Sequence, residues 1–106
     1  MAVYVYVMMQ IHDPEVYRKY TDRTPAIEQK FGGKFRTRGE EVSTLEGTPY
    51  ESRLVLLEFP DRASVDGWYN DPEYQEAVKF RKASSTMHML LVQEGGSNTS
   101  SPDPKL

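Results

Sequence analysis

The chain opens with a run in which β-branched and aromatic residues follow one another, Val3-Tyr4-Val5-Tyr6-Val7. Such residues favour extended backbone, so this run predicts a strand. Alternating charged and less polar residues predict a half-buried strand at Lys34–Arg38, and an apolar run predicts another at Arg53–Phe59. A final strand is expected at Met87–Glu94.

Helical patterns separate these strands. Asp13-Pro14-Glu15 has the residues that begin a helix, since Asp13 can cap the free amides and Pro14 suits the first turn. Pro25 interrupts the pattern, which predicts a kink or a restart capped by Thr24. The helix should end at Gly32-Gly33. Apolar residues recur along it at helical spacing, at Val16, Tyr20, Ile27 and Phe31.

A second helical region is expected between the third and fourth strands. Asp61 can cap a first segment, and Asp71-Pro72-Glu73 repeats the start signal seen at residue 13. Trp68 and Tyr74 fall at positions that predict packing of these helices on the sheet. We expect Arg81 and Lys82 on a solvated helix face.

The resulting order is β-α-β-β-α-β. It predicts an α+β fold of ferredoxin-like type, in which a four-stranded antiparallel sheet carries both helical regions on one face. We expect residues 1–94 to form this domain. The Gly, Ser, Asn and Pro composition of residues 95–106 predicts a flexible C-terminal tail.

Helices can cover only one face of such a sheet. The odd-numbered residues of the first strand should face the helices, together with Phe35 and the odd residues of Arg53–Phe59. The opposite face is also apolar, and a large apolar surface is rarely left in water. We therefore predict a homodimer in which a second sheet covers it, forming a dimeric α/β barrel. This face is expected to carry Tyr4, Tyr6, Met8, Leu54, Leu56, Leu90 and Val92.

Composition excludes several classes of function. The 106 residues carry a net charge of -3 without a basic stripe, so nucleic acid is not an expected partner. Cysteine is absent, which excludes disulfides and thiolate chemistry. Ala2–Met9 is too short to span a bilayer and lacks the basic flank of a signal peptide. We expect a cytoplasmic protein that does not bind membranes.

Several motifs then indicate a family. Gly32-Gly33-Lys34-Phe35, Arg38-Gly39, Leu45-Glu46-Gly47 and Glu58-Phe59-Pro60 precede the most specific run, which extends from Trp68 to Gln75 and reads WYNDPEYQ. From about Tyr4 to Gly95 the chain resembles the bacterial domain-of-unknown-function family thirteen-thirty. The resemblance implies a dimeric α/β barrel with a cavity. Its wider superfamily includes cofactor-independent monooxygenases, isomerases, dehydratases and haem-dependent enzymes.

Candidate chemistry follows from the expected sheet. With the first and third strands taken as parallel, Gln10, Glu58 and His88 should meet at one end of the dimer-facing surface, near Arg36 and Arg38. A carboxylate, an imidazole and an arginine there would share acid, base and anion-stabilising roles. We predict Glu58, His88 and Arg38 as catalytic residues. The predicted substrate-binding residues are Tyr4, Tyr6, Met8, Gln10, Arg36 and Leu56.

Structural interpretations of these residues remain open. Glu58 and an arginine would also form an ion pair if neither were catalytic, because buried carboxylates need partners. His88 would equally suit a hydrogen-bonded position at a strand edge. No histidine spacing typical of metal sites occurs, and neither a phosphate-binding glycine loop nor a dinucleotide motif is present. We expect neither metal nor cofactor.

Three functional hypotheses result. The first is a homodimeric, cofactor-independent enzyme performing acid/base chemistry of isomerase, dehydratase or lyase type on a small hydrophobic or aromatic metabolite. The second is a non-catalytic protein that binds such a molecule, and the third is a structural protein. Oxygenation without a cofactor, as in the monooxygenases of the wider superfamily, is an alternative reaction for the enzyme of the first hypothesis.

Overall fold

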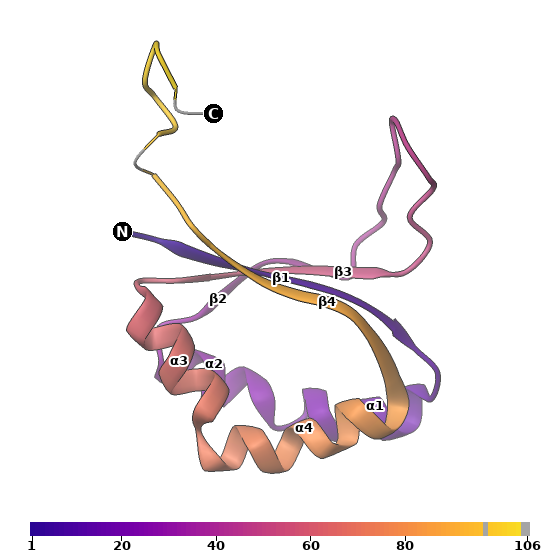
Figure 1. Ribbon diagram of the computed structural model, residues 1–106. Helices are drawn as coiled ribbons and strands as arrows, with labels where there is room; N and C mark the ends of the chain where they lie inside the picture. Colours follow the sequence, from indigo (N-terminus) through magenta and orange to yellow (C-terminus); the bar gives the residue numbers. More distant parts are fainter. Residues whose placement is uncertain (97, 105–106) are drawn as a thin grey trace.

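The computed structural model describes residues 1–96 and 98–104. A four-stranded sheet forms one layer, and all the helices lie on one side of it (Figure 1). The strands are β1 (Val3–Ile11), β2 (Lys34–Arg38), β3 (Arg53–Phe59) and β4 (Ser85–Glu94). The helices are α1 (Pro14–Thr21), α2 (Thr24–Lys30), α3 (Arg62–Asn70) and α4 (Pro72–Ser84). The expected α+β ferredoxin-like fold is confirmed.

Aspartate caps begin three of these helices as expected. The Asp13 carboxylate accepts from the Val16 amide, Asp61 from Ser64, and Asp71 from Glu73 and Tyr74. The restart near Pro25 is also confirmed. Thr24 does not cap it, however, because it is the first helical residue and its side chain is buried.

The sheet order is β2-β3-β1-β4. β1 is antiparallel to both β3 and β4, and β2 is antiparallel to β3. The expectation that the first and third strands are parallel is therefore wrong. β1 and β2 run in one direction, and β3 and β4 run in the other.

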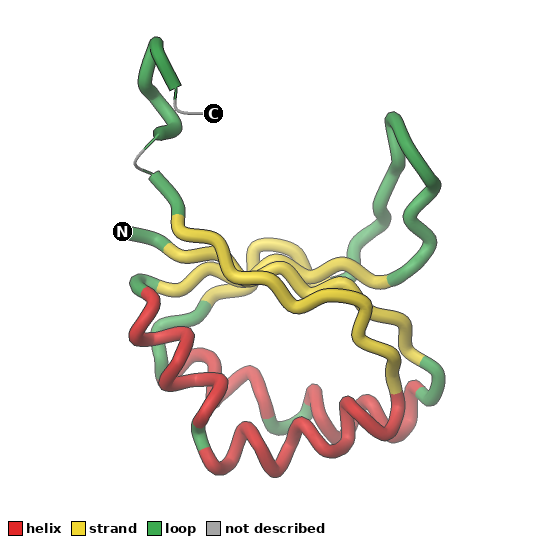
Figure 2. The backbone as a smooth tube through the Cα atoms, viewed as in Figure 1, coloured by secondary structure: helices red, strands yellow, loops and turns green. Residues whose placement is uncertain are grey.

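The core lies between the sheet and the helices, and β1 shows why. From Val3 to Met9 its odd-numbered side chains are buried and its even-numbered ones are only partly so. Figure 2 shows that the helices cover this one side of the sheet. Half of the buried core residues from the helices are aromatic, namely Tyr17, Tyr20, Trp68 and Tyr74. The predicted packing of Trp68 and Tyr74 on the sheet is confirmed.

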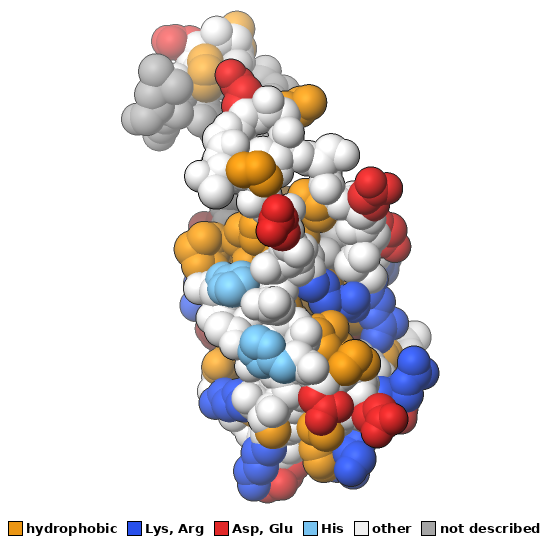
Figure 3. Space-filling model, turned by 90° about the vertical axis from the view of Figure 1, so that its right-hand side faces the viewer, with side chains coloured by type: hydrophobic (Ala, Val, Ile, Leu, Met, Phe, Trp, Pro, Cys, Tyr) orange, Lys and Arg blue, Asp and Glu red, His pale blue; other side chains and the backbone are white. Residues whose placement is uncertain are grey.

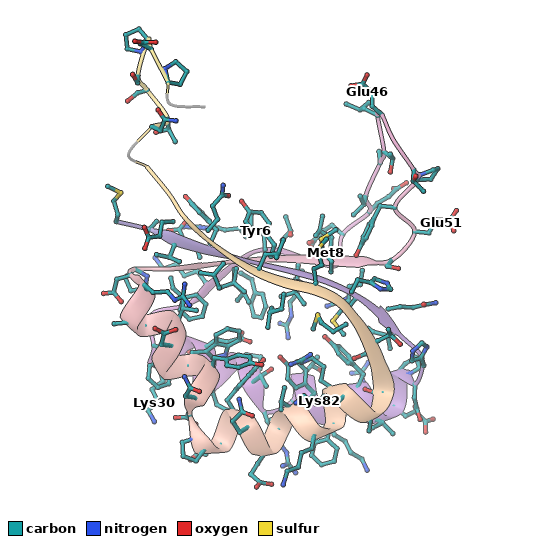
Figure 4. The ribbon with its side chains drawn as sticks, viewed as in Figure 1. Tyr6, Met8, Lys30, Glu46, Glu51 and Lys82 are labelled. Carbon is teal, nitrogen blue, oxygen red and sulfur yellow. The ribbon has the colours of Figure 1, made fainter. Side chains whose placement is uncertain are left out.

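The other face of the sheet carries no helix. Tyr6 and Met8 lie on this free face (Figure 4). Residues 39–52, between β2 and β3, project from the same side, and so do residues 98–104 after β4 (Figure 1). Leu45 in the first of these segments is 97% exposed.

The β4 residues that lie on each face of the sheet differ from those expected. Val7 pairs with Leu90 and Val5 with Val92, so these two β4 residues lie on the helix side. Met89 and Leu91, each 46% exposed, lie on the free face instead. The alternation of residues along a strand separates its side chains into two sets. The register with the neighbouring strand decides on which face of the sheet each set lies.

Among the described residues, no helix has the length and apolar composition that crossing a membrane requires.

Candidate functional site

The residues predicted to form one catalytic group lie in separate places. Glu58 is opposite Tyr4 at the start of β1, whereas Gln10 is opposite Thr86 at its other end. His88 lies in a bulge of β4 opposite Met8 and Met9. Tyr4 and Met8 are four residue steps apart along the strand, which is roughly 13 Å. Glu58 and His88 therefore do not share a site within one chain.

Each of these two residues has another partner. Glu58 accepts a hydrogen bond from Arg36 at 3.2 Å, and the two side chains form an ion pair. The alternative prediction, that Glu58 pairs with an arginine, is thus confirmed. His88 Nε2 lies 3.1 Å from Ser52 Oγ. Both histidines of the chain are at the surface in the view of Figure 3.

Arg38 lies on the opposite side of the sheet from the predicted group. The pairing of β2 with β3 shifts between Phe35 and Thr37, so Arg36 is an extra, bulged residue. After the bulge, the side chains of β2 point to the opposite faces of the sheet from those that simple alternation predicts. Arg38 therefore lies beside Val55 on the helix side. Its guanidinium carbon lies 4.3 Å from the centre of the Phe35 ring. The expected grouping of Arg38 with Glu58 and His88 is therefore wrong.

The predicted binding residues also divide between regions. Tyr4, Tyr6, Met8 and Leu56 lie on the free face of the sheet. Tyr6 donates a hydrogen bond to Gln93 Oε1 at 2.9 Å, across β1 and β4. Gln10 is exposed at the far end of β1. The individual roles assigned to these residues remain predictions.

A different set of polar residues converges inside the molecule. A cavity of about 30 Å³ lies between the sheet and the helices. It has room for ordered water. Its polar lining combines one carboxyl, three guanidinium groups and three phenol hydroxyls, supplied by Glu28, Arg38, Arg53, Arg81, Tyr17, Tyr20 and Tyr74.

Glu28 is the most unusual member of this set. It lies on α2 among the buried positions, with 4% of its surface exposed. Its Oε2 has no hydrogen-bond partner among the described residues. Burial raises the pKa of this carboxyl to about 7, although the positive charge of Arg38 partly opposes the rise. A carboxyl group titrating near neutral pH can both accept and donate a proton.

Arginines on two other elements face the same cavity. Arg81 is 4% exposed on α4, and its Nε has no partner in the described part of the chain. The expectation that Arg81 lies on a solvated face is therefore wrong. Its guanidinium carbon is 5.7 Å from the centre of the Tyr20 ring. The Nε of Arg53, on β3, is likewise buried without a hydrogen bond among those residues.

The phenol groups complete the lining. Tyr20 and Tyr74 share a hydrogen bond of 2.7 Å between their hydroxyls. Burial raises the pKa of Tyr74 to about 12 and that of Tyr20 well above its usual value, so both stay protonated. Burial also raises the pKa of Tyr17, with Arg53 acting in the opposite direction. All three can therefore donate hydrogen bonds.

The sequence contains a signal for this site that our prediction missed. Thr24, Ile27, Glu28 and Phe31 follow helical spacing, so Glu28 falls on the stripe that faces the core. A charged residue on the core-facing side of a helix indicates a buried ionisable group. No cluster of three or more histidine, aspartate or glutamate side chains suited to a metal ion occurs in residues 1–96 and 98–104.

Solved structures confirm the fold over most of the chain. A methylated form of the protein RPA0582 matches with a TM-score of 0.73 and 21% identity, covering 93% of this chain and 84% of that one. The same protein, described as of unknown function from Rhodopseudomonas palustris, also matches in a second structure at 22% identity, with a TM-score of 0.70, covering 91% of this chain and 83% of that one. At these identities the likeness concerns the fold alone.

Another match has a described activity. SnoaB, a cofactor-independent oxygenase from Streptomyces nogalater, has a TM-score of 0.64 at 14% identity, covering 94% of this chain and 98% of that one. A dimeric ferredoxin-like protein of unknown function from Jannaschia has the same TM-score at 18% identity, covering 90% and 100%. No curated protein matches the chain.

A family model covers nearly all of the described domain. It matches residues 2–95 and represents a domain of unknown function, DUF1330. The motifs between Gly32 and Gln75 lie within this span, as the sequence comparison anticipated. The chain therefore belongs to the DUF1330 family.

Proposed function

We propose that the protein is a cofactor-independent enzyme that transfers protons on a small hydrophobic or aromatic metabolite, whose reacting atoms replace water in the cavity between the sheet and the helices. One observation carries the proposal. Glu28 is a buried carboxyl with an unpaired oxygen, a pKa near 7 and arginine and phenol groups facing the same space. Perturbed carboxyls in cavities are typical of acid/base catalysts.

The chemistry begins with the ionised form of Glu28. Its carboxylate takes a proton from a carbon next to a substrate carbonyl, and the electron pair of that C–H bond moves onto the carbonyl oxygen. Arginine and tyrosine donors stabilise the resulting enolate. Return of the proton to another carbon gives an isomer, whereas expulsion of a leaving group gives an elimination product. Neither outcome requires a cofactor.

A second candidate is cofactor-independent oxygenation, the activity described for the Streptomyces protein with the same fold. It is supported by the same residue, because a carbanion formed by Glu28 would be the species that reacts with oxygen. Oxygen consumption during the assays below separates the two candidates. A protein that only binds its ligand would show neither reaction.

The proposed enzyme is a homodimer formed through the free face of the sheet. That face exposes apolar side chains of all three neighbouring strands β3, β1 and β4, and uncovered apolar surface of this extent favours association. The Jannaschia structure is described as dimeric. The apolar residues of the face are Tyr4, Tyr6, Met8, Leu54, Leu56, Met89 and Leu91.

Hydrogen exchange tests the proposal without knowledge of the natural substrate. Small aromatic carbonyl compounds are incubated with the protein in D₂O, and deuterium incorporation is measured by mass spectrometry. We expect protein-dependent exchange for some compounds, reduced about 100-fold or more in Glu28→Gln. Glu58→Gln is the matched control and should retain exchange within about twofold. Equal exchange in wild type and Glu28→Gln contradicts the role of Glu28.

A further inference from the structure

An open groove beside α1 leads towards the cavity. Its volume is about 430 Å³, and Tyr17, Thr21, Arg38 and Arg53 line both the groove and the cavity. Ile11 and Pro14 add apolar surface at its outer end. The shared residues place this groove directly beside the cavity that Glu28 lines.

The groove is lined by cationic side chains. Arg18, Arg38 and Arg53 all contribute to it, and no carboxylate does. None of the three takes part in the ion pairs found in the described part of the chain. Two carboxyl groups act on these arginines from outside the groove. Glu40 accepts a hydrogen bond from the Arg38 amide, which lowers its pKa with a smaller contribution from Arg53, and the charge of Arg38 opposes the raised pKa of Glu28. The lining of the groove itself is positively charged.

Local backbone structure makes room for Arg53. Gly39 follows β2 with φ of +83°, and a Cβ built on it would overlap the Arg53 guanidinium. Glycine thus lets that guanidinium lie against the end of β2. The buried Nε atoms of Arg53 and Arg81 are donors that no group in residues 1–96 and 98–104 satisfies. Unsatisfied buried donors of this kind favour an anionic ligand.

We propose that the substrate carries a carboxylate, which Arg53 and Arg38 bind where the groove meets the cavity. This inference rests on the proposed function and specifies its substrate class. A planar carboxylate matches the planar donors of a guanidinium. The apolar or aromatic body of the molecule then lies in the groove against Ile11 and Tyr17, and only its reacting atoms enter the cavity that Trp68 and Glu28 line.

The chain provides its own reporter for this interaction. Trp68 is the single tryptophan, lines the cavity, and has an indole nitrogen without a partner in the described residues. Benzoate and benzamide have nearly the same shape and differ in charge. Their binding to the full chain is measured from Trp68 fluorescence and by calorimetry, at low and at raised salt concentration.

We expect benzoate to bind at least tenfold more tightly than benzamide, with a preference that declines as salt is added. Arg53→Gln should remove this preference, and Arg53→Lys should retain part of it. Arg62→Gln is the matched control, because Arg62 pairs with Asp66 on α3 outside the groove. Circular dichroism establishes that each variant is folded.

Equal affinity for the two probes overturns the inference. So does a benzoate preference that survives in folded Arg53→Gln, or the absence of benzoate binding at millimolar concentration. Failure of the proposed function has a different signature. In that case Glu28→Gln leaves hydrogen exchange unchanged while the charge preference in binding persists.

Discussion

The hydroxyl groups of Tyr20 and Tyr74 lie 2.7 Å apart and connect α1 to α4 beneath the sheet. Both side chains are almost fully buried. Tyr74→Phe removes one partner and leaves the Tyr20 hydroxyl without it, which should lower the free energy of unfolding by about 1–3 kcal/mol. Urea denaturation measures the difference. Tyr69→Phe, at a more exposed tyrosine, should change stability by less than about 0.5 kcal/mol.

The raised pKa of Glu28 predicts a pH dependence of stability. The folded protein binds this proton up to about pH 7, whereas the unfolded chain releases it near the ordinary value of 4.5. The folded state is therefore favoured below pH 4.5, and stability falls as pH rises towards 7, by on the order of 3 kcal/mol from this residue. Denaturant unfolding at several pH values measures the fall.

Glu28→Gln supplies the control for that experiment. Its amide does not titrate, so the part of the decline due to Glu28 should disappear and the variant should be the more stable protein at pH 8. A variant with the same pH profile as wild type would show that Glu28 ionises normally in the folded state.

The free face of the sheet predicts the oligomeric state. Leu91→Lys places a charge in the proposed dimer interface, where it would lack a partner. Sedimentation should show wild type as a dimer and this variant as a monomer or a much weaker dimer. Lys82→Glu changes charge on an exposed position of α4 and should leave the dimer intact. A monomeric wild type would rule out the proposed interface.

Gly39 offers a test of how the groove is built. In Gly39→Ala the new methyl group must displace the Arg53 guanidinium, and the residue must also keep a positive φ. We expect lower stability together with weaker benzoate binding. Gly47→Ala is the matched control, since Gly47 also has positive φ but no atom lies within 4 Å of the added Cβ. It should lose some stability and no affinity.

The sequence predicted the elements of this fold well and the site poorly, for identifiable reasons. Aspartate-proline signals and alternation define each helix or strand locally. The register between strands and the bulges at Arg36 and His88 decide which residues of neighbouring strands lie on the same face of the sheet. No local sequence pattern indicates the register or the bulges. Arg38 was placed on the wrong side for this reason.

The buried arginine and glutamate illustrate a second limit. Arg81 and Glu28 are polar residues at core-facing helical positions. A charged residue type alone predicts a position exposed to solvent. These two residues are recognised as buried only when their position on the core-facing side of the helix is given more weight than their charge. The family resemblance gave the fold and left the position of the chemistry open.

The ionisation of Glu28 tests the central claim most directly. A ¹³C NMR titration of the side-chain carboxyl, assigned by its absence in Glu28→Gln, reports its pKa without any ligand. We expect a midpoint of about 7. A midpoint near 4.5 would contradict it, because Glu28 would then ionise as an ordinary solvated carboxyl and not as the buried group that both accepts and donates a proton near neutral pH.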